Sequence, residues 1–585
     1  MDSLAPELID RIVSYLDCHD EDTLTLSRKF QVATERERGW WRKHTVTNSN
    51  AEMFLKAYSS HRIHNLEEII FRTSLPPLEL SKERQEQDPY EPPTCRDSVD
   101  DLKAMDEEFT KQINHLFATL KTLENSTGGE AHAPQRIKLT IYTPTREVDL
   151  WHCISRKYVS WRIHLLAPET LPNISMIRAL SIVQEAAGSF SCAEAEETSA
   201  KLDSRIVLDI SAKLPNLEDL ECKLREDEWT TSLTTPSIKH YTRSWEGPHR
   251  DSRNDFAKAF QTCVLPASLK EVRLNFGHGN SMPEDVDQRQ PLPNLVKPAL
   301  YDLFSTSLRL FSHQLRILQL VVVADETLFW PNDGSEASWP NLESINIMFH
   351  MATPKGGCYF HGLHNKGRAT EGFEISASSY PPLGPEENDE VDCDEDQMDW
   401  TGSECVQFRV VPHNEVLLPF LTAFAKSAIN MRFLKEAVLW SPLAFAVGDL
   451  DKSYAPADYE ECLLSGLIDQ NDEYNQDEWG KEGLPSHLSW GVVYVAPNEY
   501  TFSSLRRDGP GESYLDSRQL WWKVGKWRPD AELHNLFQQI GKNRGEKLIE
   551  YWEDNCYGSG LVDKNTLGRC DIDSKGHSIY IPAWK

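Results

Sequence analysis

A short hydrophobic pattern recurs along the middle of the chain: one apolar residue is followed by two more, three and five positions later. The alternation in its second half is typical of a strand with one buried face. The copies are Leu66/Ile69/Phe71, Ile177/Leu180/Ile182, Leu217/Leu220/Cys222, Leu269/Val272/Leu274, Leu315/Leu318/Leu320, Leu342/Ile345/Ile347 and Leu434/Ala437/Leu439. Ile137, Leu139 and Ile141 form one further alternating stretch. The pattern therefore predicts a series of short strands.

Helical stretches precede many of these strands. They cover residues 51–58, 109–123, 205–214, 254–263, 299–311 and 415–429. Strands and helices that alternate along a chain are joined by right-handed crossovers, which produce a parallel sheet. The sequence therefore predicts an α/β fold.

The repeated strand pattern resembles the strand half of a leucine-rich repeat, which implies a solenoid with strands lining a concave face. Regular members carry Asn or Cys at a fixed offset after the strand. This chain instead has Ser74, Glu185, Arg225, Gly277, Val323, His350 and Pro442 at those positions. The strands are also unevenly spaced, from 27 residues between Leu315 and Leu342 to over 90 between Leu342 and Leu434. We expect an irregular arc over residues 46–440, with a doubly wound α/β domain as the alternative.

The N-terminus has a different pattern, with helical rather than strand spacing. Pro6 suits the first turn of a helix because it lacks the N–H that would be unpaired there. The apolar positions that follow are Leu8, Ile9, Ile12, Val13 and Leu16, then Leu24, Leu26, Phe30 and Ala33. A third helical stretch is expected to end at Trp40 and Trp41. Three short helices cannot bury an adequate core alone, so some apolar surface must face a partner or the body.

The order of these residues, with Pro6-Glu7-Leu8 and Ser27-Arg28-Lys29-Phe30, resembles an F-box over residues 1–45. The F-box is the module that docks on a Skp-type adaptor of cullin-based ubiquitin ligases. The resemblance implies that the adaptor-binding residues are Leu4, Pro6, Leu8, Ile9, Ile12 and Leu16. The alternative is that these helices only form a cap on the body.

The last part of the chain, residues 441–585, is rich in Trp, Tyr, Gly and Asp. Residues 490–495 and 519–524 are expected to be strands, and Pro529-Asp530 opens a helix with Leu533, Leu536, Phe537 and Ile540 on its apolar face. This texture, with Trp521-Trp522 and Trp527-Arg528-Pro529, resembles the C-terminal region of a group of fungal F-box proteins. We expect an α+β cap whose tryptophans are either buried core or an aromatic recognition surface.

Composition narrows the range of functions. The net charge is −30, and no basic run is visible, so a nucleic-acid surface is not expected. Neither a secretory signal nor a membrane span is expected, because the N-terminus is acidic and the apolar stretch 318–324 is too short. The twelve cysteines include no C-x-x-C pair, which favours reduced thiols in the cytoplasm or nucleus.

Candidate chemistry in the sequence is sparse. The acidic loop at residues 380–404 places Asp392, Asp394 and Asp396 at alternate positions, but Gln397 and Ser403 occupy the positions where a calcium loop needs Gly and Glu. Cys358, His361 and His364 form only a partial metal-ligand set. No phosphate-binding or nucleophile motif is present in the sequence, so no cofactor, metal or catalytic residue is predicted.

These observations favour a non-enzymatic substrate receptor of a Skp–cullin-type ubiquitin ligase, which holds an unknown protein substrate near a ubiquitin-charged enzyme. Its parts would be the adaptor-binding module (1–45), the α/β body (46–440) and the C-terminal cap (441–585). Two alternatives remain. One is an interaction scaffold without ubiquitin transfer, and the other is an enzyme housed in the α/β body or the cap.

Overall fold

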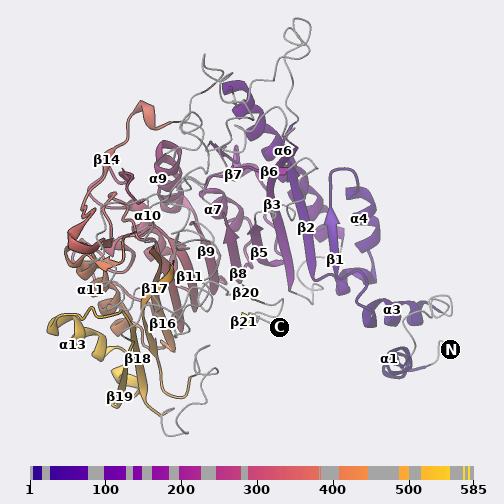
Figure 1. Cartoon of the computed structure of the whole chain (residues 1–585). Helices are drawn as coiled ribbons and strands as arrows, with labels where there is room; N and C mark the ends of the chain where they lie inside the picture. The colour runs from indigo at the N-terminus through magenta and orange to yellow at the C-terminus, as the bar shows by residue number, and fades with distance from the viewer. Residues whose placement is uncertain are drawn as a thin grey trace, which may run out of the picture. The chain divides into compact units, whose positions relative to one another are not determined.

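The computed structural model describes residues 4–15, 27–76, 98–126, 136–147, 161–183, 197–224, 246–277, 288–380, 383, 408–445, 486–499, 516–553, 571–572 and 578–579. They belong to two compact units. Unit 1 comprises residues 1–153, 162–224 and 262–269, and unit 2 comprises residues 154–161, 225–261 and 270–585. Each unit is a mixed α/β structure built on a mostly parallel sheet (Figure 1).

Unit 1 contains a sheet of parallel strands in the order β1-β2-β3-β5-β8, with β6 antiparallel to the end of β3 and a separate pair β4–β7. Helix α4 packs on β1 and α6 on β2. Its elements are α1 (Pro6–Ser14), α3 (Arg28–Glu37), β1 (Lys43–Val46), α4 (Ala51–Tyr58), η1 (His61–Asn65), β2 (Glu68–Ser74), α6 (Val99–Ser126), β3 (Ile137–Glu147), β4 (Arg162–Ile163), η4 (Pro168–Thr170), β5 (Ile177–Val183), β6 (Glu197–Ser199), β7 (Lys201–Leu202), α7 (Ile206–Ser211) and β8 (Asp219–Lys223).

Unit 2 begins with parallel strands in the order β9-β11-β12-β16, and β17, β18 and β19 extend the same sheet. Its helices are α9 (Glu246–Thr262, the last residue belonging to unit 1), α10 (Leu303–Ser312), η7 (Glu326–Leu328), η8 (Leu363–Asn365), η9 (Ala377–Ser379), α11 (Asn414–Asn430), α13 (Ala531–Gln539) and η15 (Lys542–Arg544). Its strands are β9 (Glu271–Asn275), β10 (Pro293–Asn294), β11 (Ile317–Val322), β12 (Ser344–Phe349), β13 (Phe360–His361), β14 (Phe373–Glu374), β15 (Val411–Pro412), β16 (Glu436–Phe445), β17 (Ser486–Val495), β18 (Arg518–Lys523), β19 (Leu548–Glu553), β20 (Asp571–Ile572) and β21 (Ser578–Ile579).

The recurring apolar pattern is confirmed as strands, and its copies lie in register. In unit 1 the partners across the sheet are Ile69, Leu139, Leu180 and Leu220. In unit 2 they are Val272, Leu318, Ile345 and Ala437. All eight are at most 3% exposed. A slip of one residue would turn these side chains to the other face, so burial of one face fixes the register.

In six of the seven copies the first residue precedes the strand and is buried as well, whereas Ile177 is itself the first residue of β5. Leu66, Leu217, Leu269, Leu315, Leu342 and Leu434 are all at most 1% exposed. Most lie in the turn that leads from the preceding helical or irregular segment into the strand. The predicted helices are also present, with α4 at its predicted bounds and α6 longer than predicted at both ends.

The predicted three-helix module at the N-terminus is not supported. The described residues contain α1 and α3, and residues 16–26 lie outside them. The third helical stretch predicted to reach Trp40 and Trp41 is wrong, because α3 ends at Glu37. Gly39 (φ +66°) and Trp41 (φ +69°) adopt left-handed backbone conformations, which cannot continue a right-handed helix, and the chain then enters β1.

The predicted C-terminal strands and helix are present as β17, β18 and α13. Asp530 caps α13 by accepting a hydrogen bond from the Leu533 N–H (2.8 Å). The predicted boundary at 440/441 falls inside β16, which pairs with β17 along its whole length. Nearly all of the acidic loop at residues 380–404 lies outside the described residues. No helix in the described part of the chain is both long and apolar enough to span a membrane.

Candidate functional site

The N-terminal helices α1 and α3 pack on each other through a small apolar core. Ile9 and Val13 of α1 contact Phe30 and Ala33 of α3, with Leu4 packed at the edge. Ser27 caps α3 by accepting a hydrogen bond from the Phe30 N–H. Arg36 of α3 also forms an ion pair with Asp10 of α1.

The predicted adaptor-binding residues divide between this core and the surface. Ile9 is 1% exposed and belongs to the core, whereas Leu8 (52%) and Ile12 (41%) are exposed. Pro6 is exposed, Leu4 is half-buried, and Leu16 lies outside the described residues. Tyr15, which sequence reasoning missed, is 78% exposed. Its spacing of seven from Leu8 places both on one face of the helix.

A buried ion pair attaches α3 to the segment that precedes β2. The Glu35 carboxylate, 3% exposed, accepts hydrogen bonds from Arg62 Nε and Nη2 (2.7 Å to Nη2) and lies 3.0 Å from His61 Nε2. Burial alone would raise the pKa of Glu35, but the hydrogen bonds from Arg62, His61 and Gln31 outweigh it and lower that pKa. Arg62 also stacks over Trp41 (4.1 Å to the ring centroid). The charged form of Glu35 therefore links the helix pair to the rest of unit 1.

The sheet of unit 1 has a charged face opposite its buried apolar positions. We call it the open face of unit 1. Its charged and hydroxyl side chains are Lys43, Thr45, Glu68, Arg72, Lys138, Thr140, Ser181, Asp219, Glu221 and Lys223, joined by Arg136 just before β3, and Ile70, Tyr142, Ala179 and Val183 lie among them. Glu68 pairs with Lys43 (2.7 Å), and Glu221 pairs with Lys223 (3.0 Å). These charges follow from the intervening positions of the strand pattern, which the sequence reasoning left unassigned.

The equivalent face of unit 2 is polar over much of β9, β11 and β12, where it holds Glu271, Arg273, Gln319 and Asn346. Further along the sheet it carries a buried apolar cluster, which we call the apolar face of unit 2. This cluster consists of Met348, Val438, Trp440, Val493, Val495 and Trp521, with Val321 and Tyr551 packed against it. Trp521 stacks on Tyr551 (3.8 Å between ring centroids). Trp522 faces the other side, where it packs on Phe537 of α13 and stacks on Trp552. Both Trp521 and Trp522 are at most 9% exposed, so the core interpretation is the one that fits them.

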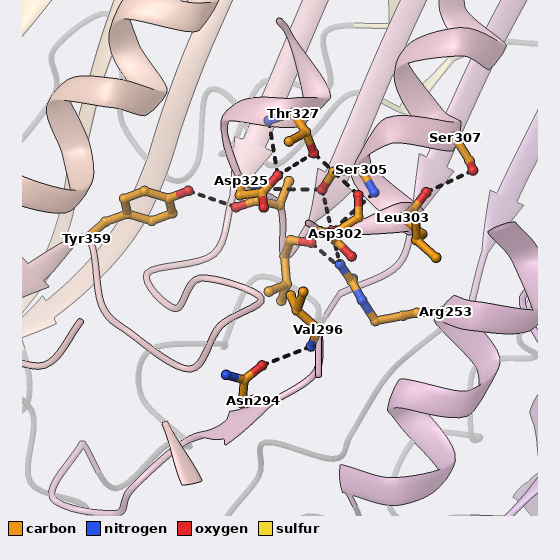
Figure 2. Close-up of polar contacts among 12 residues, drawn as sticks. Arg253, Asn294, Val296, Asp302, Leu303, Ser305, Ser307, Asp325, Thr327 and Tyr359 are labelled. Atoms are coloured by element: carbon orange, nitrogen blue, oxygen red, sulfur yellow. Dashed lines mark hydrogen bonds and ion pairs between the residues drawn. The ribbon is translucent and has the colours of Figure 1, made fainter. Parts of the chain in front are cut away.

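A buried polar network connects α9, α10 and η7 in unit 2 (Figure 2). Asp302 caps α10 by accepting hydrogen bonds from the Ser305 N–H and hydroxyl, and it forms an ion pair with Arg253 of α9 (2.5 Å). Asp325 caps η7 by accepting from the Thr327 N–H (3.0 Å) and hydroxyl (2.5 Å). The Ser305 hydroxyl accepts from the Asp325 N–H (3.3 Å), which joins the two caps.

Two carboxyl groups in one buried cluster shift the proton equilibrium there. Burial, together with the charges of Asp302 and Glu326, raises the pKa of Asp325 to about 7. Asp302, Asp325 and Arg253 are each at most 5% exposed. A carboxyl group with this pKa suits acid–base chemistry, yet its hydrogen bonds go to backbone and side chains of the same turns. The contacts of this network join helix ends, which is a structural task.

The partial metal-ligand set does not assemble among the described residues. Cys358 is a buried free thiol, and His361 lies against His413 with 5.7 Å between ring centroids. His413 Nε2 accepts from Arg368 Nε (2.8 Å), so Nδ1 carries the proton and donates to the Cys358 carbonyl (3.1 Å). Burial lowers the pKa of His413, which keeps this imidazole neutral.

Comparisons with known proteins do not identify a family. No protein-family profile matches the chain, and no curated protein is detectably similar to it. Among solved structures, one match is the β-glycosidase from the hyperthermophile Thermosphaera aggregans. It is 11% identical, and the match covers 52% of this chain and about half (55%) of that one, with a TM-score of 0.14. A TM-score this low carries no argument about fold or function, so the F-box resemblance stays a prediction.

Proposed function

We propose that this protein is the substrate-recognition subunit of a Skp–cullin-type ubiquitin ligase, in the cytoplasm or nucleus. Its mechanism would be proximity: α1 and α3 bind the adaptor, and the α/β body holds the substrate. The observation that carries the proposal is the exposed apolar face of α1. Leu8, Ile12 and Tyr15 face outward from a helix whose inner face is already filled by α3. Exposed apolar side chains gathered on one face of a helix are a feature of docking sites.

We further propose that the body is an irregular leucine-rich-repeat-like arc. Within each unit the parallel strands follow one another in sequence order, β1-β2-β3-β5-β8 and β9-β11-β12-β16. A doubly wound domain reverses its strand order at a switch point. Neither series contains such a reversal, and sequential order is the arrangement that stacked repeats produce.

The test is a double substitution on the exposed face of α1. Leu8→Asp with Ile12→Asp should weaken binding of a purified Skp-type adaptor about 100-fold or more, because two large apolar side chains contribute roughly 1.5 to 3 kcal/mol each. Binding is measured by isothermal titration calorimetry with the full-length chain. Recovery of a cullin together with the adaptor from lysate would separate a ligase subunit from a scaffold without ubiquitin transfer.

The matched control is Met53→Asp with Val99→Asp. These residues are also exposed apolar side chains of unit 1 (68% and 64%) and lie on α4 and α6. The control should bind the adaptor as the unmodified chain does, and both variants should keep its melting temperature. Unchanged adaptor affinity in the α1 variant would contradict the proposal. A large loss of melting temperature in that variant would show that this face is core.

A further inference from the structure

We propose that the free edge of β19 in unit 2 pairs with an extended apolar segment of a partner protein, which adds a strand to the sheet. Strand addition takes its affinity from main-chain hydrogen bonds and its specificity from side chains at alternate positions. The proposed function assigns no role to this edge, so the test does not require the adaptor.

In the described part of the chain β19 is the last strand of the unit 2 sheet, and it pairs there with β18 alone (Figure 1). All six residues of β18 are buried, whereas residues 548–552 of β19 are half-buried. One side of β19 is therefore accessible.

The register with β18 determines which backbone groups lie on this accessible side. The Lys547 carbonyl accepts a hydrogen bond from the Arg518 N–H (3.0 Å), so it points toward β18. Consecutive residues of a strand direct their N–H and C=O groups to opposite sides. Leu548, Glu550 and Trp552 therefore direct theirs away from β18, and none of these groups has a hydrogen-bond partner among the described residues. Donors and acceptors that recur at every second residue match those of another extended polypeptide.

The edge strand of unit 1, β1, is protected in a way that β19 is not. The Asn50 side chain lies beside β1, where its Nδ2 donates to the Thr45 carbonyl (2.9 Å) and its Oδ1 accepts from the Thr47 N–H (2.8 Å). Asn50 thus occupies backbone groups that a further strand would need. β1 is also short, with four residues against six in β19. Proteins protect sheet edges because an open edge is a template for pairing, and the described residues give β19 no such protection.

Aromatic side chains flank the free edge of β19 on both faces of the sheet. Tyr551 stacks on Trp521 on the apolar face of unit 2, with 3.8 Å between ring centroids. Trp552 stacks on Trp522 on the face that α13 covers, with 4.8 Å between ring centroids. Both Tyr551 and Trp552 are half-buried. An added strand places one side chain beside each ring, and β-branched residues pack well beside aromatic rings of a neighbouring strand. The edge therefore suits a segment with apolar residues at two successive positions.

Charge selects a different protein rather than a second copy of this chain. Two antiparallel β19 strands engage all three outward residues of each copy only in the register that places Glu550 opposite its own copy. Like charges directly opposite each other are destabilising. The net charge of −30 also makes two copies repel each other. The partner strand is therefore uncharged or basic at the position opposite Glu550.

The test is fluorescence anisotropy with the full-length chain and the labelled peptide Lys-Val-Thr-Val-Val-Thr-Lys. Leu548→Pro removes one outward N–H and places a proline ring on the free edge, while the N–H groups of Ile549 and Tyr551 remain for β18. This variant should bind the peptide about tenfold more weakly or worse, because one main-chain hydrogen bond is lost and the approach of the next strand is obstructed.

The matched control is Lys43→Pro, at the first residue of the other edge strand. The Arg42 carbonyl accepts from the Glu68 N–H (2.9 Å), so the Lys43 N–H also points away from its neighbouring strand. Lys43→Pro therefore makes the same kind of change in β1 and should leave peptide binding unchanged. The melting temperature of each variant is measured alongside.

A second measurement uses the unmodified chain and the same peptide N-methylated at every residue. This peptide keeps the side chains but has no backbone N–H donors, so it should not bind. The comparison decides whether main-chain pairing occurs even if Leu548→Pro unfolds the chain.

Three results would overturn the proposal. They are absence of saturable binding of the unmethylated peptide, equal affinity of the two peptides, and equal affinity of the two folded proline variants. Sedimentation of the unmodified chain as a dimer that Leu548→Pro converts to a monomer would also overturn it, because the edge would then belong to an interface between two copies.

Discussion

The two units share one strand pattern, but unit 2 alone builds a buried apolar cluster from part of its outward positions. In unit 1 these positions hold Lys138, Glu221 and other charged side chains, half-exposed and paired across strands. In unit 2 they are polar on β9 and β11, with Arg273 and Gln319, but on β12 and β16 to β18 they form a buried apolar cluster that includes Val438 and Trp440. Unit 2 instead buries charge at helix ends, where Arg253, Asp302 and Asp325 meet.

This difference separates what packing requires from what remains free to vary. The inward positions must be apolar in every strand, because they fill the core on one side of the sheet. The outward positions do not have to be apolar. The two units can therefore differ at these positions, and so in what they recognise, while keeping the same architecture. The open face of unit 1 and the apolar face of unit 2 should therefore respond differently to substitution, and the buried carboxyl network of unit 2 should respond to pH in the opposite way to the charges of unit 1.

The largest expected effect is on the apolar face of unit 2. Trp440→Ala should lower the free energy of unfolding by about 3 to 5 kcal/mol, because it removes a large side chain that is 1% exposed. Lys138→Ala, its counterpart on the open face of unit 1, should change it by less than about 0.5 kcal/mol. Urea unfolding of the full-length chain measures the change in unfolding free energy of each variant. Hydrogen exchange of peptides from each unit assigns that change to unit 1 or to unit 2. Equal effects would show that the two faces do not differ in packing.

The next largest effect is on the pH dependence of stability, through the buried carboxyl group of Asp325 in unit 2. The pKa of Asp325 is raised from 3.8 to about 7 in the folded state, so folding favours its protonated form. Stability from this group is therefore fully present at acidic pH and is lost as the pH rises from about 4 to about 7. Asp325→Asn keeps the side-chain oxygen that accepts from Thr327 and removes the charge. It should be more stable than the unmodified chain at pH 8, by roughly 1 to 3 kcal/mol, and similar to it at pH 4.

Thermal unfolding at the two pH values tests this prediction. Asp333→Asn is the control, because Asp333 is an exposed aspartate of the same unit, and neutralising it should not reproduce the gain at pH 8. A loss of stability in Asp325→Asn at pH 8 would show instead that the fold stabilises the charged form of this carboxylate, which is opposite to a raised pKa.

The sheet was predictable from the sequence because burial of one face imposes a period of two on every strand. The end of α3 at Glu37 was missed although the sequence signals it, because Gly39, with φ +66°, is the residue type that commonly follows a helix C-terminus. The left-handed conformation of Trp41 has no such signal in its residue type. The polar network was hidden as well, since Asp302 and Asp325 are common residue types 23 positions apart.

One further signal was available in the sequence and was missed. A charged residue directly precedes several strands, and these charged side chains form ion pairs between neighbouring strands. Arg316 and Lys435 both contact Glu343, at 2.6 and 3.1 Å, and in unit 1 Arg42 contacts Glu67. The alternation of sign from one strand to the next is visible only after the strands have been aligned by their apolar positions. The local apolar pattern was therefore enough to locate the strands, whereas the pairing of their charges could be predicted only once the register of the strands was known.

The smallest effect should appear on the open face of unit 1, with the opposite dependence on pH. The pKa of Glu221 is lowered in the folded state, so its contribution to stability is present above about pH 4.5 and is lost as the pH falls. Glu221→Gln should cost less than about 1 kcal/mol at pH 7, because the pair with Lys223 is partly exposed, and nothing at pH 3. Destabilisation at pH 3 equal to that at pH 7 would show that Glu221 acts by packing rather than by charge, and the contrast between the two units would then not extend to pH.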